Sequence, residues 1–114
     1  MAPPASAVTA EVGTRAAHGY ADGVGSMWFE ADGDHFAICD NWSDGAGTVG
    51  YWKVGRGGNV HRITYGGGSS GADACNDDNR NVPEASYVYI KVCVRNNGNV
   101  VNGTCSEWDK GYTG

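Results

Sequence analysis

The chain has 114 residues and a formal net charge of −5. Its length fits one domain, and its acidic balance argues against a nucleic-acid-binding protein, which would need a basic face. Nineteen glycines, together with many valines, threonines, tyrosines and tryptophans, favour an all-β domain with tight turns. Four cysteines in a short chain without Cys-x-x-Cys spacing indicate two disulfides and an oxidising compartment.

Residues 1–24 are mostly alanine, proline, glycine and small polar residues, with no persistent alternation. We therefore expect a flexible or extended N-terminal arm, followed by a single β-sandwich domain over residues 25–114. Terminal disorder and docking on the sheet edge of another chain are both open for this arm. We find neither a signal peptide nor a membrane span. Because Met1 directly before Ala2 resembles a start codon placed on a mature secreted chain, we expect a secreted, extracellular protein.

Strand-like runs separated by turn residues follow in chain order, at residues 26–31, 35–40, 48–54, 59–65, 87–95 and 100–108. Asp32-Gly33 between the first two runs is typical of a type I′ hairpin turn. The run 87–95 alternates most clearly, because its valines and Ile90 fall on one face while Tyr87 and Tyr89 fall on the other. The pattern predicts a small antiparallel β-sandwich, or a small open barrel, of about six to eight strands.

The four cysteines allow three disulfide connectivities. We predict Cys93–Cys105, because a bridge across a hairpin is geometrically easy. We also predict Cys39–Cys75, which would tie a long loop at residues 66–85 back to the second strand-like run. Each bridge would stabilise the fold by roughly 2–4 kcal/mol.

Acidic residues in turns raise the possibility of a calcium site, because calcium binds six to eight oxygen ligands. The weak candidates are Asp40 and Asp44, which bracket a loop, and Asp77 and Asp78 in the long loop. Turn chemistry explains the same residues, so we expect no resident metal and no cofactor. The chain has no nucleophile elbow and, with both bridges formed, no free cysteine, so we expect no enzyme activity.

Aromatic residues are numerous and provide the candidate binding site. We select Trp42 in a polar loop, Trp52, Tyr87 and Tyr89, because exposed tryptophan and tyrosine are typical of interfaces and of sugar-stacking platforms. Packing in the second layer of the sandwich explains Trp52 equally well. Arg80, within the segment 73–84, is a candidate contact of an inhibitory loop with an extracellular protease.

The run FEADGDHFAICD at residues 29–40, Asp44-Gly45, an aromatic strand and the later cysteines 75, 93 and 105 resemble small secreted actinobacterial (Streptomyces-type) β-sandwich proteins. The resemblance covers residues 26–109. Some such proteins are similar to the adaptor subunit of umbrella-shaped toxin particles, which joins a lectin subunit to a stalk subunit through an extended N-terminal segment. The resemblance implies that residues 2–24 form such an arm and that the partner is another extracellular protein.

We therefore expect a secreted, non-enzymatic binding module, most simply a protein–protein adaptor in an extracellular toxin-type assembly. The alternatives are a lectin-like domain that binds glycans through exposed aromatics, and an inhibitor of an extracellular protease. Neither nucleic acid nor a membrane is expected as a partner.

Overall fold

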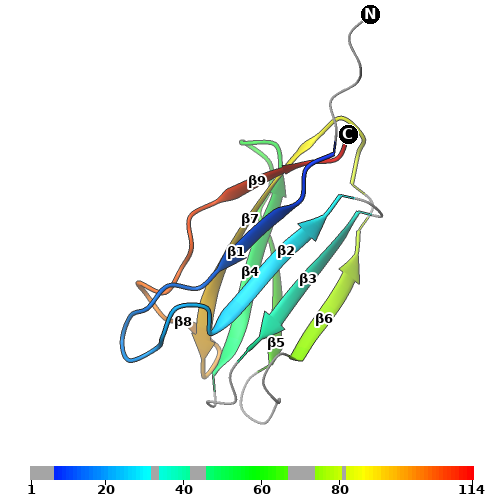
Figure 1. Ribbon diagram of the computed structural model, residues 1–114. Helices are drawn as coiled ribbons and strands as arrows, with labels where there is room; N and C mark the ends of the chain where they lie inside the picture. The colour runs from blue at the N-terminus through cyan, green and yellow to red at the C-terminus, as the bar shows by residue number, and fades with distance from the viewer. Residues whose placement is uncertain (1–6, 32–33, 42–45, 67–73, 81) are drawn as a thin grey trace, which may run out of the picture.

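The computed structural model describes residues 7–31, 34–41, 46–66, 74–80 and 82–114 (Figure 1). Two antiparallel sheets pack face to face, and the described residues form no helix. No segment within these ranges could therefore cross a membrane as an apolar helix. The strands are β1 Ala10–Gly13, β2 Gly25–Glu30, β3 His35–Asp40, β4 Gly47–Val54, β5 His61–Gly66, β6 Ala74–Asn79, β7 Tyr87–Asn96, β8 Asn99–Val100 and β9 Asp109–Tyr112.

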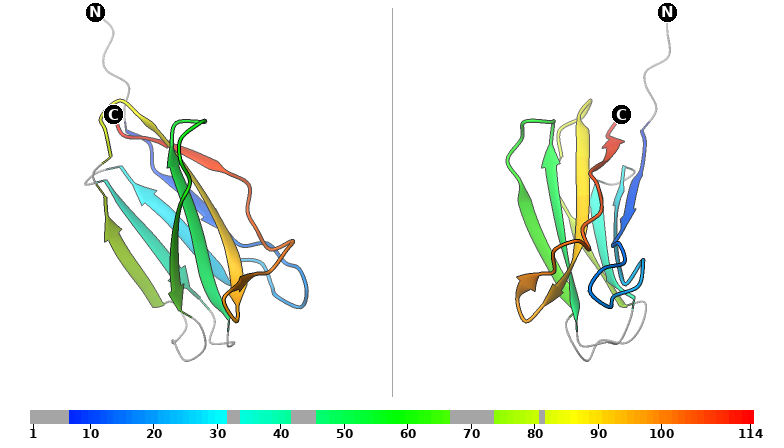
Figure 2. Two further views of the ribbon diagram at one scale, coloured as in Figure 1. Left: turned by 180° about the vertical axis from the view of Figure 1, so that it is seen from behind. Right: turned by 90° about the vertical axis from the view of Figure 1, so that its left-hand side faces the viewer.

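The sheets have four and five strands. The four-stranded sheet has the order β1-β2-β3-β6, and the five-stranded sheet has the order β5-β4-β7-β8, with β9 also paired to β7. Figure 2 shows these two layers from the side. Along one side the layers meet, because the backbone amides of Val8 and Tyr112 each donate a hydrogen bond of 2.9 Å to the other's carbonyl oxygen. The predicted all-β sandwich is confirmed.

Alternation along the strands builds the core between the sheets. From the five-stranded sheet come Val88, Ile90, Val92 and Val94, all fully buried. From the four-stranded sheet come Met27, Phe29, Phe36 and Ile38, none more than 1% exposed. The predicted inward face of residues 87–95 is therefore confirmed. Burial of each large apolar side chain contributes about 1.5–3 kcal/mol to stability.

Gly50 allows the sheets to approach closely in the middle of β4. A Cβ atom there would lie 2.5 Å from Sδ of Met27 and 3.2 Å from Cδ1 of Ile38. Both neighbours belong to the opposite sheet, so any side chain at this position would have to displace core atoms. The glycine is therefore a packing requirement of the sandwich.

Both predicted disulfides are confirmed. Cys39–Cys75 joins directly paired residues of β3 and β6, and Cys93–Cys105 joins β7 to the segment that precedes β9. The long loop expected at residues 66–85 differs in part, because Ala74–Asn79 forms strand β6 along β3. Pairing with β3 satisfies the backbone of this polar segment, which lacks the apolar alternation of a typical strand.

The described part of the N-terminal segment does not form the flexible or extended arm expected over residues 1–24. Strand β1 pairs with β2 over four residues, and the side chain of Ala10 is fully buried. Further along, Thr14 accepts a hydrogen bond from Gly25 N at its hydroxyl, and Val24 is 1% exposed in a small apolar cluster. Residues 8–24 are therefore part of the sandwich, while residues 1–6 lie outside the described ranges.

The last predicted strand and the first predicted hairpin differ in outcome. The strand expected at residues 100–108 is wrong: only Val100 is in a strand, and pairing with β7 resumes at Asp109. The hairpin between β2 and β3 is present, with Glu30 paired to His35. The turn type expected at Asp32-Gly33 concerns residues outside the described ranges.

Candidate binding surface

The outer face of the five-stranded sheet carries aromatic and lysine side chains. Directly paired residues on neighbouring strands point to the same side of a sheet. The pairs Tyr51–Lys91, Lys53–Tyr89, Tyr89–Lys110 and Tyr87–Tyr112 therefore lie on the side opposite the valine core. Trp108, 36% exposed, contacts two of these lysines. We name this set the lysine-aromatic face: Tyr51, Lys53, Tyr87, Tyr89, Lys91, Trp108, Lys110 and Tyr112.

Each lysine of this face lies over an aromatic ring. The Lys53 ammonium is 4.6 Å from the ring centroid of Trp108 and 5.6 Å from that of Tyr89. Lys91 approaches the Trp108 ring from 5.7 Å, and Lys110 lies 4.8 Å from the Tyr87 ring. Such cation–π contacts are worth about 0.5–1 kcal/mol at exposed sites. They hold the three ammonium groups above the sheet.

No carboxylate neutralises these lysines within the part of the chain that the structure describes. The ion pair found there joins Arg15 to Glu107 at 3.7 Å, with side chains 56% and 82% exposed. Asp109, next to Lys110 in the sequence, instead accepts a hydrogen bond of 3.0 Å from the backbone amide of Glu11. The lysine-aromatic face therefore presents three positive charges that aromatic rings support and that an incoming anion can neutralise.

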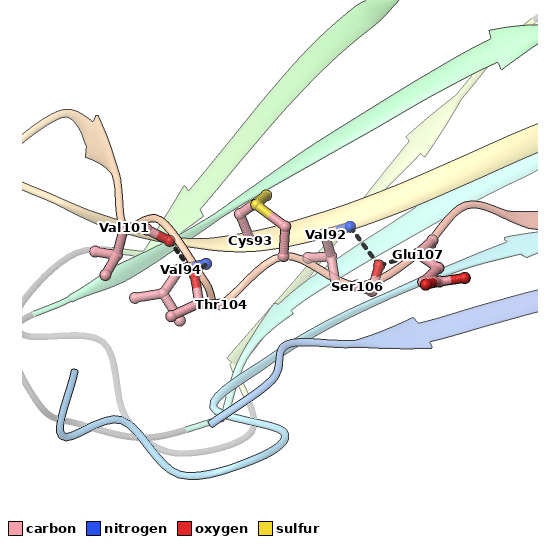
Figure 3. The surroundings of a disulfide bond; sticks show 8 residues. Val92, Cys93, Val94, Val101, Thr104, Ser106 and Glu107 are labelled. Atoms are coloured by element: carbon pink, nitrogen blue, oxygen red, sulfur yellow. Dashed lines mark hydrogen bonds between the residues drawn. A yellow bond between two sulfur atoms is a disulfide. The ribbon is translucent and has the colours of Figure 1, made fainter. Parts of the chain in front are cut away.

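A segment without strand pairing brings Trp108 to this face. We call residues 101–108 the C-terminal strap; it lies along β7 between β8 and β9 (Figure 3). Side-chain hydroxyls replace part of a strand ladder: Val94 N donates to Oγ1 of Thr104 and Val92 N donates to Oγ of Ser106, both at 3.0 Å. Ser106 N donates to the carbonyl of Val92 at 2.8 Å.

The Cys93–Cys105 bridge attaches the middle of the same strap covalently to β7 (Figure 3). Thr104 also donates its hydroxyl hydrogen to the carbonyl oxygen of Val101 at 2.6 Å, and its side chain is fully buried. The strap is therefore fixed shortly before it reaches Trp108. A rigid support of this kind lowers the entropy lost when a partner binds the indole ring.

The predicted binding residues separate into distinct places. Tyr87, 50% exposed, and the half-buried Tyr89 are brought together on the lysine-aromatic face. Trp52 is a correction: it is only 7% exposed and its ring stacks between Phe36 at 4.7 Å and His61 at 4.1 Å, so it packs as part of the core. The strand period accounts for this, since Trp52 shares a face with Gly50.

Arg80, a further predicted contact, does not join this surface. Arg80 is exposed and follows β6 of the four-stranded sheet, where its backbone amide donates to the carbonyl oxygen of Asp34 at 3.1 Å. Trp42 lies outside the described residues. Among the described residues, the predicted aromatic contacts that lie on this face are the two tyrosines of β7.

The weak calcium candidates are not assembled within the described ranges. The side chain of Asp40 is 1% exposed at the end of β3, whereas Asp77 is exposed on β6. Asp44 and the side chain of Asp78 lie outside the described parts. No group of three or more His, Cys, Asp or Glu residues that could hold a metal ion occurs among the described residues.

Comparison with known proteins gives no significant match to a protein-family model, a curated protein or a solved structure. The lysine-aromatic face therefore has to be interpreted from its own geometry. Sequence reasoning missed Lys53, Lys91, Lys110 and Trp108 as site residues. The alternation of residues 87–95 places Lys91 beside the tyrosines, but only the strand register brings Lys53 and Lys110 to the same place. Trp108 reaches the face through the C-terminal strap, outside any strand pairing.

Proposed function

We propose that this chain is an extracellular, non-enzymatic protein-binding module of the adaptor type, and that the lysine-aromatic face is its binding surface. The observation that carries the proposal is the exposed indole ring of Trp108, with two lysine ammonium groups beside it that no described carboxylate neutralises and with the exposed Tyr87 on the same face. Tyrosine and tryptophan are enriched at the energetic centres of protein interfaces. Two disulfides fit a protein that folds in an oxidising compartment.

The shape of the surface favours a protein partner over a small molecule. No pocket opens among the described residues, whereas small-molecule sites are concave and bury most of their ligand. Protein interfaces are commonly broad and lie on exposed side chains of this kind.

The ring contacts also favour a protein over a neutral glycan. A stacked sugar needs a free ring face, but Trp108 has ammonium groups of Lys53 and Lys91 against it, and Tyr87 has Lys110 and the ring of Tyr112 at 4.8 Å. The lectin-like alternative would require these lysines to move first. We therefore rank it second.

This proposal changes the part of the molecule that an adaptor would use. The resemblance implies an N-terminal arm over residues 2–24, but removal of that segment would also remove β1 and Ala10 from the sandwich. Deletion of residues 2–24 would therefore destabilise the fold as well as any contact. Membership of a toxin-type assembly remains a prediction.

The proposal is tested by capture of binding partners from culture supernatant, followed by titration of each purified candidate partner. Immobilised wild-type protein and a Tyr87→Ala, Trp108→Ala double variant are incubated with culture supernatant of the source organism, and proteins retained only by the wild type are identified by mass spectrometry. A candidate counts only after it has been purified and titrated by calorimetry. We expect binding at least tenfold weaker for the double variant, as is usual when interface aromatics are truncated.

A matched variant on the other sheet controls for general effects of aromatic removal. Trp28 is half-buried on β2, on the outer side of the four-stranded sheet. Trp28→Ala should change the affinity for the partner by no more than about twofold, because Trp28 lies outside the proposed surface and binding energy is concentrated in interface residues. An equal loss of affinity in the double variant and in Trp28→Ala, or no loss of affinity in either, would contradict the proposed surface.

A further inference from the structure

We infer that the partner of the lysine-aromatic face is a protein that presents an acidic segment, with several carboxylates that neutralise Lys53, Lys91 and Lys110. This inference rests on the proposed function and adds the chemistry of the partner. It follows from three features of the described residues: the separation of charge between the sheets, the spacing of the lysines, and the absence of a neutralising carboxylate beside them.

The two sheets carry opposite charges. The strands of the four-stranded sheet contain five acidic residues and no lysine or arginine: Glu11, Glu30, Asp40, Asp77 and Asp78. The strands of the five-stranded sheet contain one acidic residue, Asp109, and five basic ones: Lys53, Arg62, Lys91, Arg95 and Lys110. The net charge of −5 therefore conceals a basic face.

This polarity orients an acidic partner during its approach. Like charges repel and opposite charges attract over about one Debye length, roughly 8–10 Å at physiological salt. An acidic segment is repelled by the outer side of the four-stranded sheet, which carries Glu11, Glu30 and Asp77, and attracted to the lysine-aromatic face. Complementary charge of this kind raises the association rate and excludes wrong partners.

The lysines are spaced to receive carboxylates from an ordered segment. Lys53, Tyr89 and Lys110 form one cross-strand row, so Lys53 and Lys110 are two strand spacings apart, about 10 Å. Lys91 is two residues from Tyr89 along β7, a rise of about 7 Å. Carboxylates on alternate residues of an extended segment are also about 7 Å apart. One such segment can contact the row and Lys91 together.

Burial of rings and charges together strengthens the contact. A carboxylate that reaches Lys53 or Lys91 also covers the indole of Trp108, which removes water from the ion pair. Charge interactions gain strength as water is excluded, and aromatic neighbours exclude it. A second copy of this chain is another source of carboxylates, and its binding would appear as self-association.

The experiment uses a fluorescein-labelled oligo-glutamate peptide, with an oligo-glutamine peptide of the same length as the uncharged control. Fluorescence anisotropy measures binding to the wild type, to a Lys53→Gln, Lys91→Gln variant and to an Arg15→Gln, Arg56→Gln variant. Both variants lose two positive charges, but Arg15 and Arg56 lie outside the lysine-aromatic face. Comparable melting temperatures verify that all three proteins are folded.

We expect the wild type to bind oligo-glutamate and not oligo-glutamine, with an affinity that falls as salt is added. The lysine variant should bind about tenfold more weakly, since each exposed ion pair contributes up to about a factor of five. The arginine variant should remain within about twofold of the wild type. Equal weakening in both variants would overturn the inference, because it would show an effect of net charge alone.

Two further outcomes are equally decisive. Self-association of the wild type at low salt, abolished by Lys53→Gln and Lys91→Gln, would identify a second copy as the occupant and overturn a separate acidic partner. If a purified partner binds in a manner that needs Tyr87 and Trp108 but is insensitive to salt and to the lysine substitutions, the proposed function stands and the acidic partner is wrong.

Discussion

The four-stranded and five-stranded sheets pack on one core but differ in the chemistry of their outer sides. The five-stranded sheet places lysines over aromatic rings, whereas the four-stranded sheet places Glu11, Glu30 and Asp77 outward. Core packing does not require this difference, since both sheets bury apolar residues on their inner sides. The contrast locates the candidate function on the five-stranded sheet, where Lys53, Lys91 and Lys110 have aromatic neighbours but no neutralising carboxylate among the described residues.

The sheets also differ in how a disulfide is used. Cys39–Cys75 links two paired strands, β3 and β6, and so reinforces an existing ladder. Cys93–Cys105 instead holds the C-terminal strap, in which Thr104 and Ser106 hydroxyls substitute for strand pairing. The first bridge stabilises a sheet edge, and the second also fixes the approach to Trp108.

Truncation of the shared core should give the largest effect and should be similar from either sheet. Phe29→Ala on β2 removes a fully buried ring and is expected to cost about 3–5 kcal/mol; Ile90→Ala on β7 should cost about 2–5 kcal/mol. Chemical denaturation monitored by tryptophan fluorescence measures both. A large loss from one variant with little loss from the other would contradict a single core shared by the sheets.

Removal of each disulfide should sharpen the contrast between the bridges. The bridged cysteines are separated by 36 residues in Cys39–Cys75 and by 12 in Cys93–Cys105. Loop-closure entropy predicts a loss of about 4 kcal/mol for the first bridge and about 3 kcal/mol for the second when both cysteines become serine. Only the second pair of substitutions should also increase the solvent exposure of Trp108, measured by fluorescence quenching. Equal changes in quenching would refute the role assigned to the strap.

Removal of a single hydroxyl should have the smallest effect on stability, and the effect should differ between the two sheets. Ser106→Ala leaves the amide of buried Val92 without its side-chain acceptor, which costs about 1–3 kcal/mol. Ser26→Ala on β2 should cost less, because the amide group of Asn41 that contacts Ser26 also donates to the carbonyl oxygen of Gly23 at 3.0 Å. Paired melting curves measure the difference, and a larger loss for Ser26→Ala would contradict the account of the strap.

The residue pattern within single segments is sufficient to predict much of the fold. The alternation in residues 87–95 identified the core valines and placed Tyr87 and Tyr89 outward, and cysteine placement gave both bridges. Polar β6 escaped prediction because pairing with β3, and not apolar alternation, makes it a strand. Strand β1 also escaped prediction, because residues 8–24 show no apolar alternation and β1 becomes a strand by pairing with β2.

The candidate surface depended on information that local pattern does not contain. Lys53, Lys91 and Lys110 lie in three separate strands, and their proximity follows from the register of β4 and β9 on β7. The sequence predicts a strand that includes Trp108, whereas in the structure Trp108 is the last residue of the unpaired C-terminal strap. The overall acidic charge further concealed a basic face, because net charge does not record how charges are distributed.

The central claim is that the outer side of the five-stranded sheet binds an acidic protein segment. The most direct measurement is a set of two-dimensional amide NMR spectra of the isotope-labelled protein during titration with oligo-glutamate. The account predicts that the largest shifts occur at residues 87–91, Lys53, Lys110 and the indole N–H of Trp108. Larger shifts at Glu11, Trp28 and Asp77 of the four-stranded sheet would contradict it.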